Sequence, residues 1–204
     1  RDLALAKDAG FTDIVVDVRP TTGDVLFKTN LVDQVKFMYA WIGSNYTKVE
    51  RTATWDYLQA FVDEARKQGL RIHAAINTFV GGNQIDGGTG LLYRDQSKAE
   101  WATQMNMQVG ITSVMNTSES TKFFNPAHPE VQTFLCDLLK DLAGYDLDGI
   151  FLDRGRFLNL QADFSEESRK QFEEYMGGIR IQNYPNDILA PGASSLPATY
   201  PKYL

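Results

Sequence analysis

Three times along this chain an amphipathic helical segment leads, after only a few residues, into a short apolar run with the length of a buried strand. The helices are predicted at 2–9, 54–68 and 129–144, and the strands that follow them at 14–18, 72–76 and 150–152. Apolar residues recur at helical spacing, as at Leu58, Phe61 and Val62 in the second helix. This alternation predicts parallel βα units and therefore an α/β fold.

The connections between these elements are lopsided. Each helix reaches its strand within a few residues, whereas the chain after the first strand runs from 19 to 53 before the next helix, and after the second from 77 to 128. Connections this long inside a compact domain are usually functional. Ligands of parallel α/β folds bind at the carboxyl ends of the strands, where these connections emerge. A binding site is therefore expected there.

The third predicted strand ends in an acid. The stretch 145–154 reads YDLDGIFLDR, which is a turn, a strand suited to burial on both faces, and Asp153 where the chain leaves the sheet. Barrel enzymes keep catalytic groups at this position, so Asp153 is the candidate catalytic residue. The alternative is a structural ion pair with Arg154 or Arg156.

Composition and charge argue against several classes of protein and of binding partner. An apolar fraction of 43% and a charged fraction of 23% are typical of a globular domain, and no apolar run is long enough to span a membrane. The net charge of −6 disfavours nucleic acid and anionic membranes as partners, whereas a neutral ligand is compatible. Cys136 stands alone, so no internal disulfide forms. His73 and His128 are too isolated for a zinc site, and we expect neither a metal nor a cofactor.

The outline of the chain suggests part of a larger domain. The first helix has no strand before it, and after a fourth predicted helix at 165–176 the tail is rich in Pro, Gly, Ser and Tyr without periodicity. Three strands by themselves would leave unpaired edges, and a closed eight-stranded barrel takes about 250 residues. We expect residues 1–182 to supply about the second to fourth strands of a barrel, and 183–204 to be a loop or linker towards later strands.

Four blocks of the sequence carry a family resemblance. In chain order they are VVDVRP at 15–20, ARKQGLRIHAAIN at 65–77, NPAHPEV at 125–131 and YDLDGIFLD at 145–153. Together they resemble the glycosyl-hydrolase-like family-10 proteins. A looser likeness is to the α-amylase superfamily, whose fourth strand ends in a nucleophilic aspartate and whose third ends near an asparagine, as Asp153 and Asn77 do here. That superfamily has an arginine where this chain has Phe151, so its mechanism is not carried over.

The resemblance implies a (β/α)₈ TIM barrel, an exported bacterial protein and a carbohydrate ligand. We expect a glycoside hydrolase that acts on a polysaccharide or oligosaccharide, with Asp153 as nucleophile or charge stabiliser. A non-catalytic carbohydrate-binding barrel is the alternative. Because hydrolysis usually needs a second carboxyl group, the general acid is expected from a later strand or, with less weight, from Asp163, Asp24 or Asp86.

The other two strand ends offer polar groups. Arg19 is suited to bind a sugar hydroxyl or to hold Asp153 ionised, and a structural bridge to Asp17 or Asp24 is equally open. Asn77 offers a donor and an acceptor to a hydroxyl, and capping its own loop is the alternative. Asp17 lies inside its strand and is expected to be a buried, paired acid rather than a catalyst.

Aromatic residues are frequent in both long connections. Their flat faces suit the C–H faces of pyranose rings as well as they suit packing of the loops, and most are expected to be loop core. Trp41 and Tyr93, which lie near Gly43 and Gly90, are expected to be sugar platforms. We also expect Arg154 and Arg156, which follow the third strand, to contact the substrate.

Overall fold

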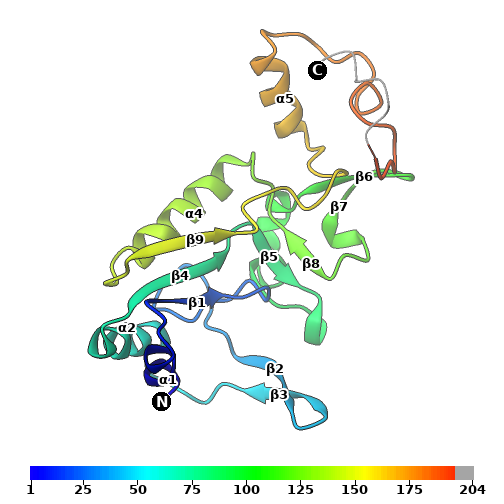
Figure 1. The fold of residues 1–204 in the computed structure, drawn as a ribbon. Coiled ribbons are helices and arrows are strands. Elements are labelled where there is room, and N and C mark those ends of the chain that lie inside the picture. The colour runs from blue at the N-terminus through cyan, green and yellow to red at the C-terminus, as the bar shows by residue number, and fades with distance from the viewer. Residues whose placement is uncertain (196–204) are drawn as a thin grey trace.

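A parallel sheet of three strands forms the centre of the structure, a computed structural model that describes residues 1–195 (Figure 1). The strands are β1 (Asp13–Arg19), β4 (Arg71–Asn77) and β9 (Gly149–Asp153), in the order β1-β4-β9. In the register of the sheet, Asp17 lies opposite Ala75, which lies opposite Phe151. All three predicted strands and the α/β class are confirmed.

Four of the helices are those predicted from periodicity. They are α1 (Asp2–Asp8), α2 (Tyr57–Gln68), α4 (Pro129–Leu142) and α5 (Glu166–Tyr175). Helix α2 begins later than predicted because Asp56 caps it, accepting a hydrogen bond from the Gln59 N–H at 3.1 Å. It ends at Gly69, whose φ of 64° suits a glycine. None of the helices in residues 1–195 is long and apolar enough to cross a membrane.

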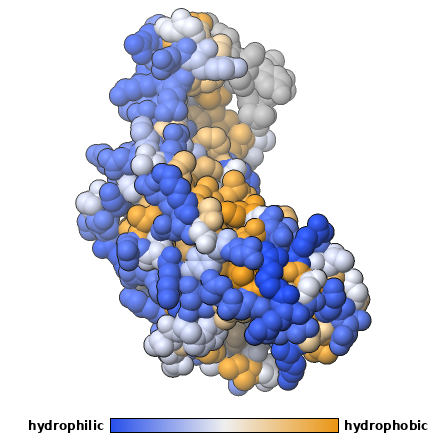
Figure 2. All heavy atoms as spheres, turned by 90° about the vertical axis from the view of Figure 1, so that its left-hand side faces the viewer, coloured by the Kyte–Doolittle hydropathy of each residue, from blue (hydrophilic) through white to orange (hydrophobic). Residues whose placement is uncertain are grey.

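Helices α2 and α4 cover one face of the sheet. A single hydrophobic cluster joins alternate strand residues to both helices and includes Val16, Ile72, Ile76, Leu58, Val62 and Leu138. The opposite face is open over the described residues, since Val15 is 53% exposed and Phe151 is 52% exposed. Figure 2 shows apolar surface lying between hydrophilic regions on the side at the left of Figure 1. One face of the sheet is therefore a packed core and the other is accessible.

The long connections fold into small structures of their own, which periodicity did not predict. The first contains the hairpin β2 (Phe37–Ile42) and β3 (Asn45–Glu50), which projects from the body in Figure 1. The second pairs β5 (Val80–Asn83) with β8 (Thr121–Phe123) and β6 (Gln104–Met107) with β7 (Gly110–Ser113). It also holds α3 (Leu91–Arg94) and the 3₁₀ turns η1 (Ile85–Gly87), η2 (Gln96–Trp101) and η3 (Val114–Asn116).

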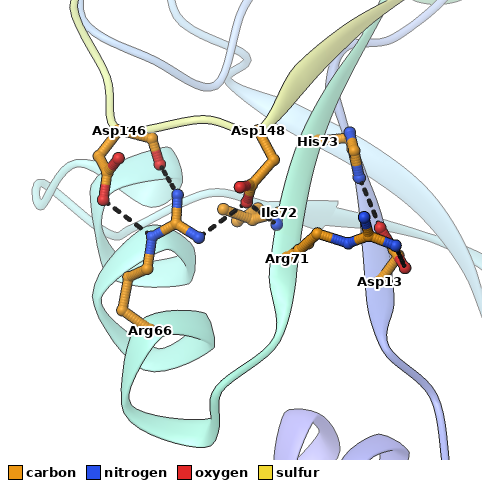
Figure 3. A network of polar contacts seen from close by, with 7 residues as sticks. All are labelled: Asp13, Arg66, Arg71, Ile72, His73, Asp146 and Asp148. Atoms are coloured by element: carbon orange, nitrogen blue, oxygen red, sulfur yellow. Dashed lines mark hydrogen bonds and ion pairs between the residues drawn. The ribbon is translucent and has the colours of Figure 1, made fainter.

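A polar network ties the amino end of β9 to α2 (Figure 3). Arg66 of α2 donates to the Asp146 carboxylate at 2.8 Å and to the Asp148 carboxylate at 2.7 Å. Asp148 in turn accepts the Ile72 N–H of β4 at 2.8 Å. These contacts hold the short turn before β9 against both the helix and the neighbouring strand.

A second network, on β1 and β4, lies beside the first (Figure 3). The Asp13 carboxylate accepts a hydrogen bond from Arg71 at 2.7 Å and lies 2.9 Å from Nε2 of His73. Arg71 and then His73 hold the pKa of Asp13 well below its ordinary value, so this acid is ionised at neutral pH. Both networks lie at the end of the sheet opposite to the long insertions.

Helix α5 is fixed to the segment that follows it by one buried acid. The Glu173 side chain is 3% exposed and accepts the Ile181 N–H at 2.9 Å, Arg180 at 2.6 Å and Arg169 at 3.1 Å. These three donors lower the pKa of Glu173 to about 2, and the Ile181 N–H has the largest effect. The tail expected as a linker at 183–204 begins with turns, and its residues 196–204 lie outside the described part.

Replacing Glu173 by glutamine is expected to lower stability at neutral pH and to matter little at pH of about 2. The folded pKa of about 2 lies below the ordinary value of 4.5, so the unfolded chain binds the proton more readily. The stabilisation is therefore complete above pH 4.5 and is lost as the pH falls towards 2. Urea midpoints of the two proteins should converge over this interval. The neighbouring exposed Glu174→Gln control should show no such convergence, and a gap that persists in acid would contradict the expectation.

Candidate functional site

The carboxyl ends of the three central strands form the candidate site. Because the strands are parallel and in register, Asn77 and Asp153 lie side by side as the last residue pair of β4 and β9. Asp17 lies two residues before the end of β1. The long insertions leave the sheet at this end (Figure 1).

Asp153 is exposed and is held by backbone groups. Its Oδ1 accepts the Arg154 N–H at 2.7 Å, and its carbonyl oxygen accepts the Thr78 N–H at 2.7 Å. Among residues 1–195, no lysine or arginine forms an ion pair with this carboxylate. The bridge to Arg154 or Arg156, the structural alternative for Asp153, is not formed here. The carboxylate is therefore accessible to a ligand.

Asp17 is exposed rather than buried and paired, which corrects the expectation from sequence. It lies on the open face because Val16 and Val18, on either side of it, point into the core. Its Oδ1 accepts the Arg19 N–H at 3.2 Å. Partial desolvation by its neighbours raises the pKa of Asp17, the Arg19 N–H opposes this, and the nearby charge of Asp153 raises it further. Asp17 was therefore not among the site residues expected from sequence.

Arg19 and Asn77 are buried and join the ends of β1 and β4. Arg19 is fully buried, and its guanidinium donates to the carbonyl oxygens of Asn77, Thr78 and Val80. The Asn77 side chain returns a hydrogen bond to the Arg19 carbonyl at 2.9 Å. Burial lowers the pKa of Arg19 to about 10, so it remains a cation at neutral pH. In this arrangement the Arg19 guanidinium and the Asn77 amide bond to main-chain carbonyls.

The two arginines after β9 have different environments. Arg154 is half-buried, with a φ of 47° that directs the chain sharply out of the strand. Arg156 is exposed and donates to the carbonyl oxygens of Phe157 at 3.0 Å and Leu158 at 2.8 Å. Arg156 therefore holds its own loop, whereas Arg154 lies directly beside Asp153.

Trp41 lies in an aromatic strip on one face of the β2–β3 hairpin. It is 70% exposed and pairs across the strands with Tyr46, whose ring centre is 5.3 Å away. Tyr46 also stacks on Tyr39 at 5.3 Å. Tyr39 donates to Asp86 of η1 at 3.1 Å, and Lys48 forms an ion pair with the same carboxylate. The hairpin is thus anchored at Asp86 and presents its tip rings to solvent.

Tyr93, the second expected platform, is packed against glycines. A Cβ atom on Gly88 would lie 2.2 Å from its ring, and one on Gly82 would lie 3.1 Å from it. The glycines therefore make room for the Tyr93 ring at these two positions. One part of that ring is covered by backbone and the side chain is half-buried.

Two hollows on the surface of the protein lie away from Asp153. One of about 380 Å³ lies under α5 and is lined mainly by apolar side chains such as Phe172 and Tyr184. Another of about 740 Å³ lies beside Trp55 and Arg51. Neither is lined by Asp153, which lies on the open face of the sheet. In the described part of the chain, no group of three or more His, Cys, Asp or Glu side chains is arranged to hold a metal.

Two accessible carboxyl groups on one surface have a defined chemical capability. One carboxylate can attack or stabilise an electron-poor carbon while the other, if protonated, gives its proton to a departing oxygen. Of the two, Asp17 has a raised pKa, caused first by desolvation, and this favours its protonated form.

Comparisons with known proteins identify a family for this chain. The model of a family described as glycosyl hydrolase-like 10 matches residues 2–186. An S-layer-related protein of Niallia circulans is 31% identical over 194 residues, which are 91% of this chain but only 12% of that protein, so most of the relative has no counterpart here. The crystal structure of a hypothetical protein from Ruminiclostridium thermocellum ATCC 27405 matches 84% of this chain and 77% of its own with a TM-score of 0.53. At 14% identity this likeness concerns the fold alone.

Proposed function

This chain belongs to the glycosyl hydrolase-like 10 family, and we propose that it carries part of the active site of a glycoside hydrolase acting on a polysaccharide or oligosaccharide. The observation that carries this function is the exposed Asp153 at the end of β9, which lacks a cationic partner among residues 1–195. Its role is that of nucleophile or charge stabiliser. An ionised carboxylate beside the anomeric carbon stabilises the positive charge that develops there as the glycosidic bond breaks.

We further propose that residues 1–182 are part of a (β/α)₈ barrel wall. Both covering helices lie on one face of the parallel sheet, whereas doubly wound sheets carry helices on both faces. A barrel buries the lower part of the other face, where the exposed Val15 lies, against its own remaining strands, and the strand ends that carry Asp17 and Asp153 open at its mouth. Residues 183–204 would then lead towards the later strands.

The substrate-binding surface in this proposal includes Trp41 and Arg154. Trp41, with Tyr46 beside it, offers flat ring faces to the C–H faces of sugar rings. Arg154 lies next to the catalytic position and offers hydrogen-bond donors to hydroxyl groups. That the Niallia circulans relative is an S-layer-related protein supports export to the cell surface, where polysaccharides are accessible.

The second candidate function is a carbohydrate-binding barrel without catalysis. It is favoured by one observation, because the hollows of about 740, 460 and 380 Å³ are not lined by Asp153. Such a protein would keep the aromatic platforms and would not depend on a second carboxyl group.

Hydrolysis itself separates the two functions. The full-length protein is incubated with a panel of bacterial and plant polysaccharides, and new reducing ends are counted. Release of reducing ends above a blank supports the hydrolase. Binding to a glycan without any release across the panel would favour the carbohydrate-binding barrel.

Replacing Trp41 by alanine is expected to weaken glycan binding about tenfold, which corresponds to roughly 1.4 kcal/mol. The loss arises because the most exposed ring of the hairpin strip no longer covers a sugar face. Calorimetric titration in an Asp153→Asn background avoids turnover of the ligand. Tyr175→Ala, which removes an 85% exposed aromatic ring at the end of α5, is the control and should bind as before. Equal affinity of the Trp41 variant and its parent would exclude the platform role.

A further inference from the structure

We infer that Asp17 is the second carboxyl group of the active site and gives its proton to the oxygen of the departing sugar. This role rests on the proposed function and adds to it the general acid. From the sequence, that acid was expected in a later strand or in a loop. The structure offers a different candidate on the first strand of the sheet.

The register of the sheet places Asp17 on the same face as Asp153. Asp17 lies opposite Ala75, and Asp153 lies opposite Asn77, two residues further along β4. Because side chains alternate along a strand, Ala75 and Asn77 point to the same side, and so do the residues paired with them. The two acids therefore flank the end of β4 from its two neighbouring strands.

The loop acids that were alternatives are already occupied. Asp24 is buried and forms an ion pair with Arg94. Asp86 pairs with Lys48 at the base of the hairpin. Asp163 accepts five hydrogen bonds from backbone and hydroxyl groups around it. Each is committed to holding a loop, and none is free to exchange a proton with a ligand without breaking that loop.

Asp17, by contrast, has no cation bound to it within residues 1–195. The polar and titratable groups that act on it are the N–H and the guanidinium of Arg19, the Asn77 amide on β4, the Asp153 carboxylate on β9 and, through charge alone, the Tyr57 hydroxyl at the start of α2. The Arg19 guanidinium is turned away to main-chain carbonyls. Desolvation, and then the charge of Asp153, raise the pKa of Asp17, which favours the protonated form that an acid catalyst needs.

The proposed step conserves atoms and charge. The bond between the anomeric carbon and the bridging oxygen breaks while the bridging oxygen takes the proton of Asp17 and leaves as an alcohol. Asp153 balances the positive charge on the sugar, by attack or by proximity. Water then supplies a hydroxyl group to the anomeric carbon, and its remaining proton returns to Asp17.

Two substrates with different leaving groups test whether Asp17 acts as a general acid. A sugar leaving group needs protonation, whereas dinitrophenolate is a stable anion and leaves without it. In the full-length protein, Asp17→Asn should lower kcat/KM on the cleaved polysaccharide by about 10² to 10⁴. On a dinitrophenyl glycoside of the oligosaccharide product it should lower kcat/KM less than about tenfold, and the fall of activity on the alkaline side of the pH profile should disappear.

The controls separate this role from the proposed function. Asp8→Asn, an equal change of charge at an exposed position on α1, should leave both rates unchanged. Asp153→Asn should lower both. An Asp17→Asn protein that keeps full polysaccharide activity, or loses both activities equally, overturns the role of Asp17 while hydrolysis dependent on Asp153 still stands. A wild-type protein that hydrolyses nothing on the panel removes both proposals. Circular dichroism of each variant confirms that it is folded.

Discussion

Replacing Asp153 by asparagine is expected to lower kcat on a cleaved polysaccharide by about 10³-fold or more. Asparagine has the same shape and can still accept the Arg154 N–H, so the end of β9 keeps its conformation. It lacks the charge that attacks or stabilises the anomeric carbon, and a 10³-fold loss corresponds to about 4 kcal/mol of transition-state stabilisation. Initial rates of reducing-end release measure the effect.

Binding provides the internal check on this result. The dissociation constant for the same glycan should change by less than about threefold, because sugar rings are bound mainly by aromatic faces and neutral hydrogen bonds. Loss of turnover with binding retained identifies a residue that acts in the transition state. Unchanged turnover would contradict the role of Asp153, and a parallel loss of affinity would point to a binding role instead.

Replacing Arg19 by methionine is expected to lower the free energy of unfolding by about 3 to 5 kcal/mol. Methionine fills much of the space but leaves the carbonyl oxygens of Asn77, Thr78 and Val80 without their donor. The contact of the guanidinium with the Phe124 ring, 5.9 Å from its centre, is lost as well. Urea unfolding should show a lower midpoint with an unchanged slope.

Arg154→Met is the matched control for this stability effect. Arg154 is half-buried and its side chain makes no hydrogen bond within the described residues, so its loss should cost no more than about 0.5 kcal/mol. If Arg19→Met destabilised the protein as little as the control, water would have to reach the carbonyl groups at the end of β4. That outcome would contradict the closed, buried strand end described above.

The central strands and their helices could be predicted from the sequence because residue spacing and segment length indicate the same element at each position. The spacing of Leu58, Phe61 and Val62 predicts α2, and the run 150–152 predicts β9; both elements are confirmed. The insertions were not predicted because their strands are short and pair within a loop. In β3 every residue is exposed, so the alternation of apolar and polar residues that marks a half-buried strand is absent.

The candidate site was predicted only in part, for a physical reason. Asp153 was found because a strand end is visible in sequence, and whether it acts in catalysis stays a prediction. Asp17 was assigned to the interior because a parallel strand is usually covered on both faces, whereas here one face is open. Its alternation with Val16 and Val18 was the signal that could have revealed it. For Arg19, the sequence suggested a ligand or a carboxylate as the partner. In the structure its partners are the main-chain carbonyl oxygens of Asn77, Thr78 and Val80, which no sequence pattern indicated.

The two polar networks lie at the amino ends of the strands, so the contacts that stabilise the sheet are at the opposite end from the loops that would contact a ligand. Arg66 and Asp13 form these contacts at the end of the sheet where each helix is joined to its strand by only a few residues. The loops at the carboxyl ends of the strands can be lengthened or can change their aromatic residues during evolution without altering these stabilising contacts. Relatives with this frame can therefore diverge in what they recognise without first having to rebuild what keeps them folded.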